Sequence, residues 1–112
     1  MVFDQHVAER RTGMYFVIFA TDRPDHEKVR TGERPRHRQY IRDPGLPVRP
    51  RVAGPTLDAD SETMNGSLFI IEAEDMAAAE AFIAEDPYNQ AGLFETIIIR
   101  PFHWDVGRPD GV

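Results

Sequence analysis

The stretches MYFVIFA, residues 14–20, and SLFIIEA, residues 67–73, decide the fold of this chain. Aromatic and branched aliphatic side chains dominate both stretches, and such side chains favour β-strands. Alternate residues of a strand point to opposite faces, and each stretch is apolar at both sets of positions. A strand that is apolar on both faces is buried on both, so we expect these stretches to form the central strands of a sheet.

A polar helical region, residues 24–41, follows the first stretch. We expect this region to be broken, because Gly32 and Pro35 interrupt it. Proline is tolerated in the first turn of a helix, where its missing N–H would have no partner. The sequence therefore predicts a second helix over residues 35–41, with His37 in its first turns.

Three more elements are predicted in the rest of the chain: a strand, an alanine-rich helix and a last strand, over residues 48–56, 76–84 and 93–102. Pro50 indicates an edge strand, because proline cannot donate a hydrogen bond to a neighbouring strand. Asp75 is a suitable N-cap for the helix. The order β-α-β-β-α-β is that of the ferredoxin-like split sandwich, an α+β fold with one four-stranded antiparallel sheet and both helices on one face.

Two helices cover only one face of such a sheet, whereas the central strands are apolar on both. A second copy of the sheet is the simplest cover for the other face, so we expect a homodimer through this open face, with a ligand that fills the face as the alternative. The pairing register decides which side chains are open. The two candidate sets are Tyr15, Val17, Phe19, Phe69, Ile71 and Ile97, or Phe16, Ile18, Leu68, Ile70 and Ile98.

Composition and charge narrow the classes of function. The chain has 112 residues, no cysteine and a formal net charge of −6. That charge disfavours nucleic-acid binding, which needs clustered Lys and Arg. No apolar run approaches the roughly 20 residues that a membrane span needs, so we expect a cytoplasmic protein. Basic residues nevertheless concentrate between Arg23 and Arg51, which indicates either a solvated basic face or a positive pocket for an anionic small molecule.

The two ends of the chain differ from the domain between them. Residues 1–13 are polar, and we expect them to be an extension or the result of an upstream start codon. Two arginines before the apolar run at 14–20 loosely imitate a secretion signal, but the run is short and no small-residue cleavage site follows, so a buried strand is the better interpretation. The domain is expected to cover residues 14–104, followed by a loose tail at 105–112.

His37 and Asp86 form the candidate site. The predicted topology brings both to helix ends at the same edge of the sheet, where a carboxylate fixes the tautomer of an imidazole and raises its basicity. We expect the two side chains to lie within hydrogen-bond reach, or one water apart, and to line a wet cleft. The alternative is structural, with His37 packed at a helix N-terminus and Asp86 as a turn residue before Pro87.

Two neighbouring residues complete the candidate site. Arg34 is predicted to hold an anionic group of a substrate, or else to pair with Glu33 or Glu85 on the surface. Tyr88 is predicted to pack on the core with a wet hydroxyl, or to form a wall of the pocket and donate a hydrogen bond to a ligand.

Taken together, these features resemble the YCII-related domain family. The resemblance rests on motifs in a fixed order: Arg34-Pro35-x-His37, Ala53-Gly54-Pro55, Gly66-Ser67, an alanine-rich helix, Asp86-Pro87-Tyr88, Ala91-Gly92 and Pro101-Phe102. It implies the dimeric α+β barrel fold and an active-site pair at His37 and Asp86. Most proteins of this kind have no assigned reaction, but one related enzyme type removes chloride from a chlorinated hydroxyquinol, and the fold neighbours include muconolactone isomerases. The first helical region is longer and richer in arginine than that of the shortest family members, so the resemblance does not fix the size of the substrate.

No cofactor is predicted. The sequence contains no Gly-rich phosphate loop, nucleophile elbow or dinucleotide fingerprint, and the spacing of its histidines matches no zinc pattern. We therefore interpret the chain as a cofactor-free lyase or isomerase for a small cyclic or aromatic acid, with His37 as general acid and base, Asp86 as its orienter and Arg34 as the electrostatic anchor. The alternatives are a small-molecule binding or sensing dimer with the same pocket, and a plain dimerisation module.

Overall fold

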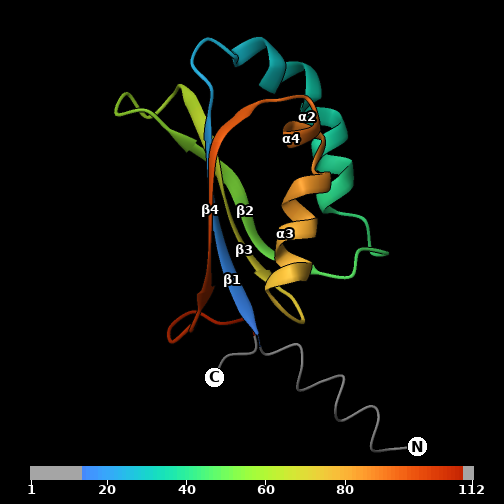
Figure 1. Ribbon diagram of the computed structural model, residues 1–112. Helices are drawn as coiled ribbons and strands as arrows, with labels where there is room; N and C mark the ends of the chain where they lie inside the picture. Colours follow the sequence, from blue (N-terminus) through green and yellow to red (C-terminus); the bar gives the residue numbers. More distant parts are fainter. Residues whose placement is uncertain (1–13, 110–112) are drawn as a thin grey trace, which may run out of the picture.

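A computed structural model of the chain describes residues 14–109, which form one antiparallel sheet covered on one face by helices (Figure 1). The strands are β1 (Tyr15–Asp22), β2 (Arg49–Leu57), β3 (Met64–Glu72) and β4 (Phe94–Phe102), and the helices are α2 (Glu27–Ile41), α3 (Met76–Glu85) and α4 (Pro87–Gln90). The strand order is β2-β3-β1-β4, so β1 and β3 are central and β2 is an edge strand, as predicted. The predicted extension, residues 1–13, lies outside the described residues.

Helix α2 is continuous, so the predicted break at Gly32 and Pro35 is wrong. Both residues lie on the exposed side of the helix. Pro35 removes one hydrogen bond to the carbonyl one turn earlier, but on an exposed side water can replace that bond. The opposite side carries the buried Arg30 and His37, and their contacts with the sheet and with α4 favour an unbroken helix.

The second helical region has a feature that the sequence did not predict. Helix α3 begins as expected, because the Asp75 carboxylate accepts a hydrogen bond from the Ala78 N–H at 2.8 Å. After α3 ends, the chain forms one more short helix, α4, which starts at Pro87. This extra turn packs beside α2 and thereby brings the end of α3 to the middle of α2.

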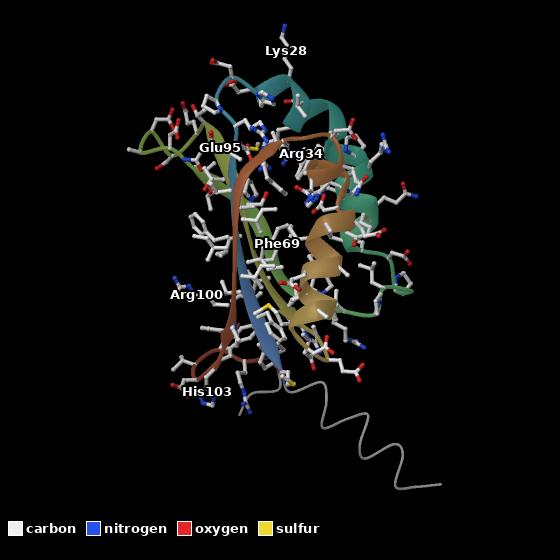
Figure 2. The ribbon with its side chains drawn as sticks, viewed as in Figure 1. Lys28, Arg34, Phe69, Glu95, Arg100 and His103 are labelled. Carbon is white, nitrogen blue, oxygen red and sulfur yellow. The ribbon has the colours of Figure 1, made fainter. Side chains whose placement is uncertain are left out.

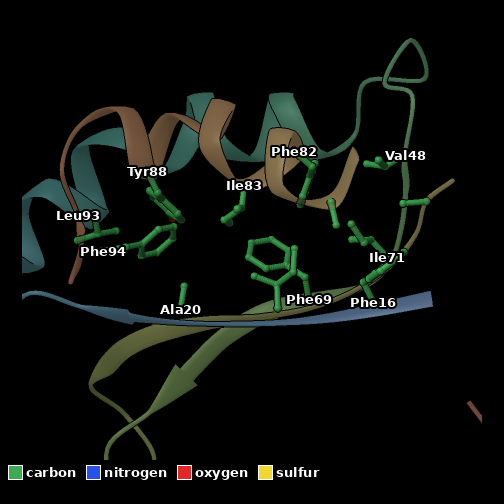
Figure 3. Packing of buried hydrophobic residues seen from close by; sticks show 13 residues of the cluster. Phe16, Ala20, Val48, Phe69, Ile71, Phe82, Ile83, Tyr88, Leu93 and Phe94 are labelled. Atoms are coloured by element: carbon green, nitrogen blue, oxygen red, sulfur yellow. The ribbon is translucent and has the colours of Figure 1, made fainter. Parts of the chain in front are cut away.

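The core lies between the sheet and the three helices (Figure 3). The sheet contributes the large buried side chains of the central strands, and the helical side contributes aromatic and aliphatic ones: Phe16, Ile18, Phe69, Ile71, Phe82, Ile83, Tyr88 and Leu93. None of the helices in residues 14–109 combines the length and the apolar composition of a membrane span.

The pairing register corrects both predicted sets of open-face residues. Phe19 pairs with Leu68, and Val17 pairs with Ile70, so these side chains share one face of the sheet. Phe69 and Ile71 lie on the helix face with Phe16 and Ile18. Each predicted set therefore mixed the two faces, because a shift of one residue in register exchanges every side chain between them. The apolar and aromatic side chains that β1–β4 place on the open face are Tyr15, Val17, Phe19, Val52, Leu68, Ile70, Ile98 and Phe102.

Candidate functional site

His37 and Asp86 lie in contact under the middle of α2. Both carboxylate oxygens of Asp86 are 2.9 Å from Nδ1 of His37. A carboxylate only accepts hydrogen bonds, so the proton of the neutral imidazole is held on Nδ1 and the lone pair is left on Nε2. Nε2 makes no hydrogen bond with residues 14–109. The predicted contact is confirmed, whereas the catalytic role of the pair stays a prediction.

The junction between α3 and α4 fixes the position of Asp86. Its backbone N–H donates to the Ile83 carbonyl at the end of α3, and its side chain accepts from the Tyr88 N–H at 2.9 Å at the start of α4. Pro87 suits the first position of α4, where no N–H is needed. Asp86 is fully buried, so the prediction that it lines a wet cleft is wrong. Its carboxylate lies against the His37 imidazole and the first turn of α4.

Tyr88 is both a core residue and a wall of the site. Its ring stacks on the imidazole of His37 with a centroid separation of 4.0 Å and an interplanar angle of 15°. Burial raises the pKa of the Tyr88 phenol above its usual value, so the hydroxyl keeps its proton at neutral pH and can donate a hydrogen bond. The predicted packing on the core is confirmed, but the residue is only 2% exposed, so the predicted wet hydroxyl is wrong. The side chain also lines the cavity described below, and its donation to a ligand stays a prediction.

Sequence reasoning missed Arg30, which is buried beside Tyr88 at the same site. Its guanidinium donates to the Asp22 carboxylate at 2.7 and 2.9 Å and to the Ser67 hydroxyl at 2.9 Å. It also lies 4.6 Å from the centroid of the Tyr88 ring. The spacing of residues 30, 34 and 37 could have identified it, because positions i, i+4 and i+7 lie on one face of a helix.

A cavity of about 220 Å³ opens beside His37. It is lined from α2 by Arg30, Arg34, His37, Arg38, Ile41 and Arg42, from the sheet by Ala53, Gly54, Pro55, Met64, Ser67 and Phe69, and from α4 by Tyr88. Figure 2 shows Arg34 and Phe69 on the helix side of the sheet, and Arg100 on the opposite side. The structure therefore brings three of the four predicted site residues, Arg34, His37 and Tyr88, to one cavity, with Asp86 behind them.

Arg34 is free to meet a ligand. Its side chain is exposed at the cavity and makes no ion pair with any residue in the range 14–109. The predicted surface pair with Glu33 or Glu85 is therefore not formed among these residues, and Glu33 pairs with Arg36 at 3.3 Å. Within the same range, no group of His, Asp and Glu side chains is arranged to hold a metal ion.

Known proteins match this chain over most of its length. The YCII-related domain family matches residues 14–103. An uncharacterized protein of Haemophilus influenzae is 34% identical over 94 residues, and protein YciI of Escherichia coli is 35% identical over 94 residues. Each alignment covers 80% of this chain and 96% of the relative. The family resemblance drawn from the sequence motifs is thereby confirmed.

A solved structure of similar fold is that of 5-chloro-2-hydroxyhydroquinone dehydrochlorinase from Burkholderia phenoliruptrix, in complex with 2,5-dihydroxybenzoquinone. The two structures superpose with a TM-score of 0.70 at 34% sequence identity, over 80% of this chain and 93% of that chain. The similarity confirms the predicted ferredoxin-like α+β fold.

Proposed function

Because the chain belongs to the YCII-related domain family, we propose that it is a cofactor-free lyase or isomerase that acts on a small cyclic or aromatic acid. One observation carries the proposal. Nδ1 of His37 is held by the buried Asp86 carboxylate at 2.9 Å, and the same imidazole lines a cavity. An imidazole held in this way offers the Nε2 lone pair to a ligand as a base.

Each residue of the site has a separate part in the proposed mechanism. His37 removes a proton from the ring compound and later returns it or releases it to water. Asp86 orients the imidazole and stabilises its charged form, as a carboxylate does in other His–carboxylate pairs. Arg34 attracts an anionic substituent of the substrate, and the Tyr88 hydroxyl donates a hydrogen bond to a ring oxygen. General acid–base catalysis contributes only about 10²–10⁴-fold, so binding and orientation in the cavity supply the rest.

Elimination of hydrogen chloride is the first reaction to test. The similar structure from Burkholderia phenoliruptrix is named a dehydrochlorinase. In such a reaction a base takes a proton from the ring compound while chloride leaves with the electron pair of the carbon–chlorine bond. His37 supplies the base, and no electron is exchanged with a cofactor. A cavity of about 150 Å³ accommodates benzene, so the cavity of about 220 Å³ has room for one substituted ring.

We also propose that the protein works as a homodimer through the open sheet face and resides in the cytoplasm. A non-catalytic small-molecule binding or sensing dimer is the second candidate function. One feature favours it: the His37 side chain is only 10% exposed and is stacked against Tyr88. A ring held so firmly also suits a rigid binding site that performs no chemistry.

The test is a screen of chlorinated hydroxyquinols, small cyclic acids and lactones. Chloride release and changes in ring absorbance report turnover, and calorimetry reports binding. The proposal requires turnover of at least one compound by the natural protein and none by His37→Ala. Full activity in His37→Ala would exclude the mechanism, and binding without turnover across the whole set would favour the second candidate.

A further inference from the structure

The cavity beside His37 is strongly cationic in a protein that is acidic overall. Arginines at positions 30, 34, 38 and 42 all line it, and no Asp or Glu is among its lining residues. Successive members are four residues apart, which puts the first three along one face of α2 and Arg42 at its C-cap, with a rise of roughly 6 Å between neighbours in the helix. The net charge of the whole chain is −6, so the positive potential is local to this cavity.

Three of these four guanidinium groups are uncompensated. Arg30 is neutralised by Asp22 inside the protein. Arg34, Arg38 and Arg42 make no ion pair with any residue in the described range, 14–109. Like charges four residues apart destabilise a helix, so this row carries a cost that a bound anion would relieve. The negative end of the helix dipole accounts for one cation in the last turn, but it does not require three along one cavity.

We propose that the ligand of this cavity carries two separate anionic groups on one ring. Arg34 binds the first group near His37, and Arg38 with Arg42 binds the second at the helix C-terminal end of the cavity. The spacing of neighbouring arginines is comparable to the separation of two substituents across a six-membered ring. Guanidinium forks bind carboxylates through paired hydrogen bonds, which makes the row selective for dicarboxylates. This inference rests on the proposed function only in taking the ligand to bind beside His37.

The test compares benzene-1,3-dicarboxylate with benzoate by calorimetry on the full chain. We expect the dicarboxylate to bind at least about tenfold more tightly than benzoate, and the preference to shrink with added salt. The double variant Arg38→Gln, Arg42→Gln should lose most of that preference and keep its affinity for benzoate within about twofold. Arg36→Gln is the matched control, because Arg36 is on the same helix, is paired with Glu33 and does not line the cavity.

Several results would overturn the inference. They are equal affinity for the two probes, no binding of the dicarboxylate, an equal loss in Arg36→Gln, or tighter binding of phenyl phosphate, which carries both charges on one group. Circular dichroism of each variant shows whether the fold is kept. Binding is measured here independently of turnover. A protein that prefers the dicarboxylate but turns over no compound would contradict only the proposed function. A protein that turns over a monoanionic ring compound without that preference would contradict only this inference.

Discussion

Asp86 serves the fold and the site through the same two oxygens. It accepts hydrogen bonds from His37 on α2 and from the first turn of α4, and it is completely buried. Replacing a buried carboxylate that accepts several hydrogen bonds lowers the free energy of unfolding. Each donor that loses its partner stays buried, where no water can replace the lost hydrogen bond. The residue that orients the proposed base is therefore also a structural residue.

For this reason we expect Asp86→Asn to lower turnover less than His37→Ala does, but to destabilise the protein more. The carboxamide oxygen can still accept from His37 and Tyr88, whereas its NH₂ group would be buried near Nδ1 without an acceptor. The expected loss is about 1–3 kcal/mol in the free energy of unfolding. Denaturant titration and kcat/KM of both variants check this. An Asp86→Asn protein that matches the natural one in both measurements would contradict the role given to the pair.

Tyr40 provides a pH-dependent measure of the packing between α2 and α3. Its hydroxyl donates to the Phe82 carbonyl at 2.8 Å. Burial, with the nearby Asp86 and Glu85 charges, raises the pKa of the Tyr40 phenol to about 12. The phenol of an unfolded chain titrates near pH 10. Below about pH 10 both states keep the proton and the stability is fully present, and above it the unfolded state loses its proton first.

Stability should therefore fall between about pH 10 and pH 12 as the pH rises. In Tyr40→Phe this fall should be shallower, although not absent, because the pKa of Tyr88 is also raised. Denaturant unfolding of the two proteins across this pH range measures the two slopes. Equal slopes would show that Tyr40 titrates alike in the folded and unfolded states.

At the scale of elements, two glycines have opposite effects on stability, one in a helix and one in a strand. Gly32 lies in the continuous α2, and a Cβ added there would meet no atom within 4 Å. Gly66 lies in β3, where a Cβ would be 2.3 Å from the Ala20 carbonyl oxygen of β1 and 2.7 Å from the Thr56 hydroxyl of β2. The first glycine costs the helix backbone entropy, and the second allows three strands to approach one another.

We therefore expect Gly32→Ala to raise the free energy of unfolding by about 0.5–1 kcal/mol. The same substitution at Gly66 should lower it by about 1–3 kcal/mol, because backbone atoms of a neighbouring strand must shift. Each variant is the other's control, since both add one methyl group. Thermal or denaturant unfolding decides the matter, and a destabilised Gly32→Ala would contradict a continuous α2.

For the whole molecule, the open face of the sheet is the feature to explain. Phe19 and Ile98 pair across β1 and β4 and are 45% and 49% exposed. Exposed apolar faces of this kind mark interaction sites in water-soluble proteins. Trp104 covers only one corner of the open face, where its ring centroid lies 5.3 Å from that of Tyr15. A second copy of the sheet remains the simplest partner.

Light scattering at micromolar concentration should accordingly give the mass of a dimer. The charged variant Ile98→Glu should be monomeric, because two carboxylates would be buried in a self-complementary interface. Val106→Glu is the control, since Val106 is 86% exposed and lies outside the strands. A monomeric natural protein, or a dimeric Ile98→Glu, would exclude an interface through this face.

The sequence by itself determined the strands, their order in the sheet and the contact between His37 and Asp86. The run at residues 14–20 favours a central strand and Pro50 favours an edge strand, and both preferences can be read from local sequence. The pairing of His37 with Asp86 also followed from the topology and from the family motifs. Their contact is now confirmed at 2.9 Å.

Only the tertiary structure decided the features that depend on several elements together. The continuity of α2 depends on which side of the helix Gly32 and Pro35 occupy. The open face depends on register, where one residue of shift exchanges the two faces. The burial of Asp86 depends on the start of α4 and on His37 of α2, and the burial of Arg30 depends on Asp22 of β1, Ser67 of β3 and the Tyr88 ring of α4. Local propensity cannot specify helix continuity, strand register or burial of this kind. The free energies that decide them come from contacts between residues far apart in the chain.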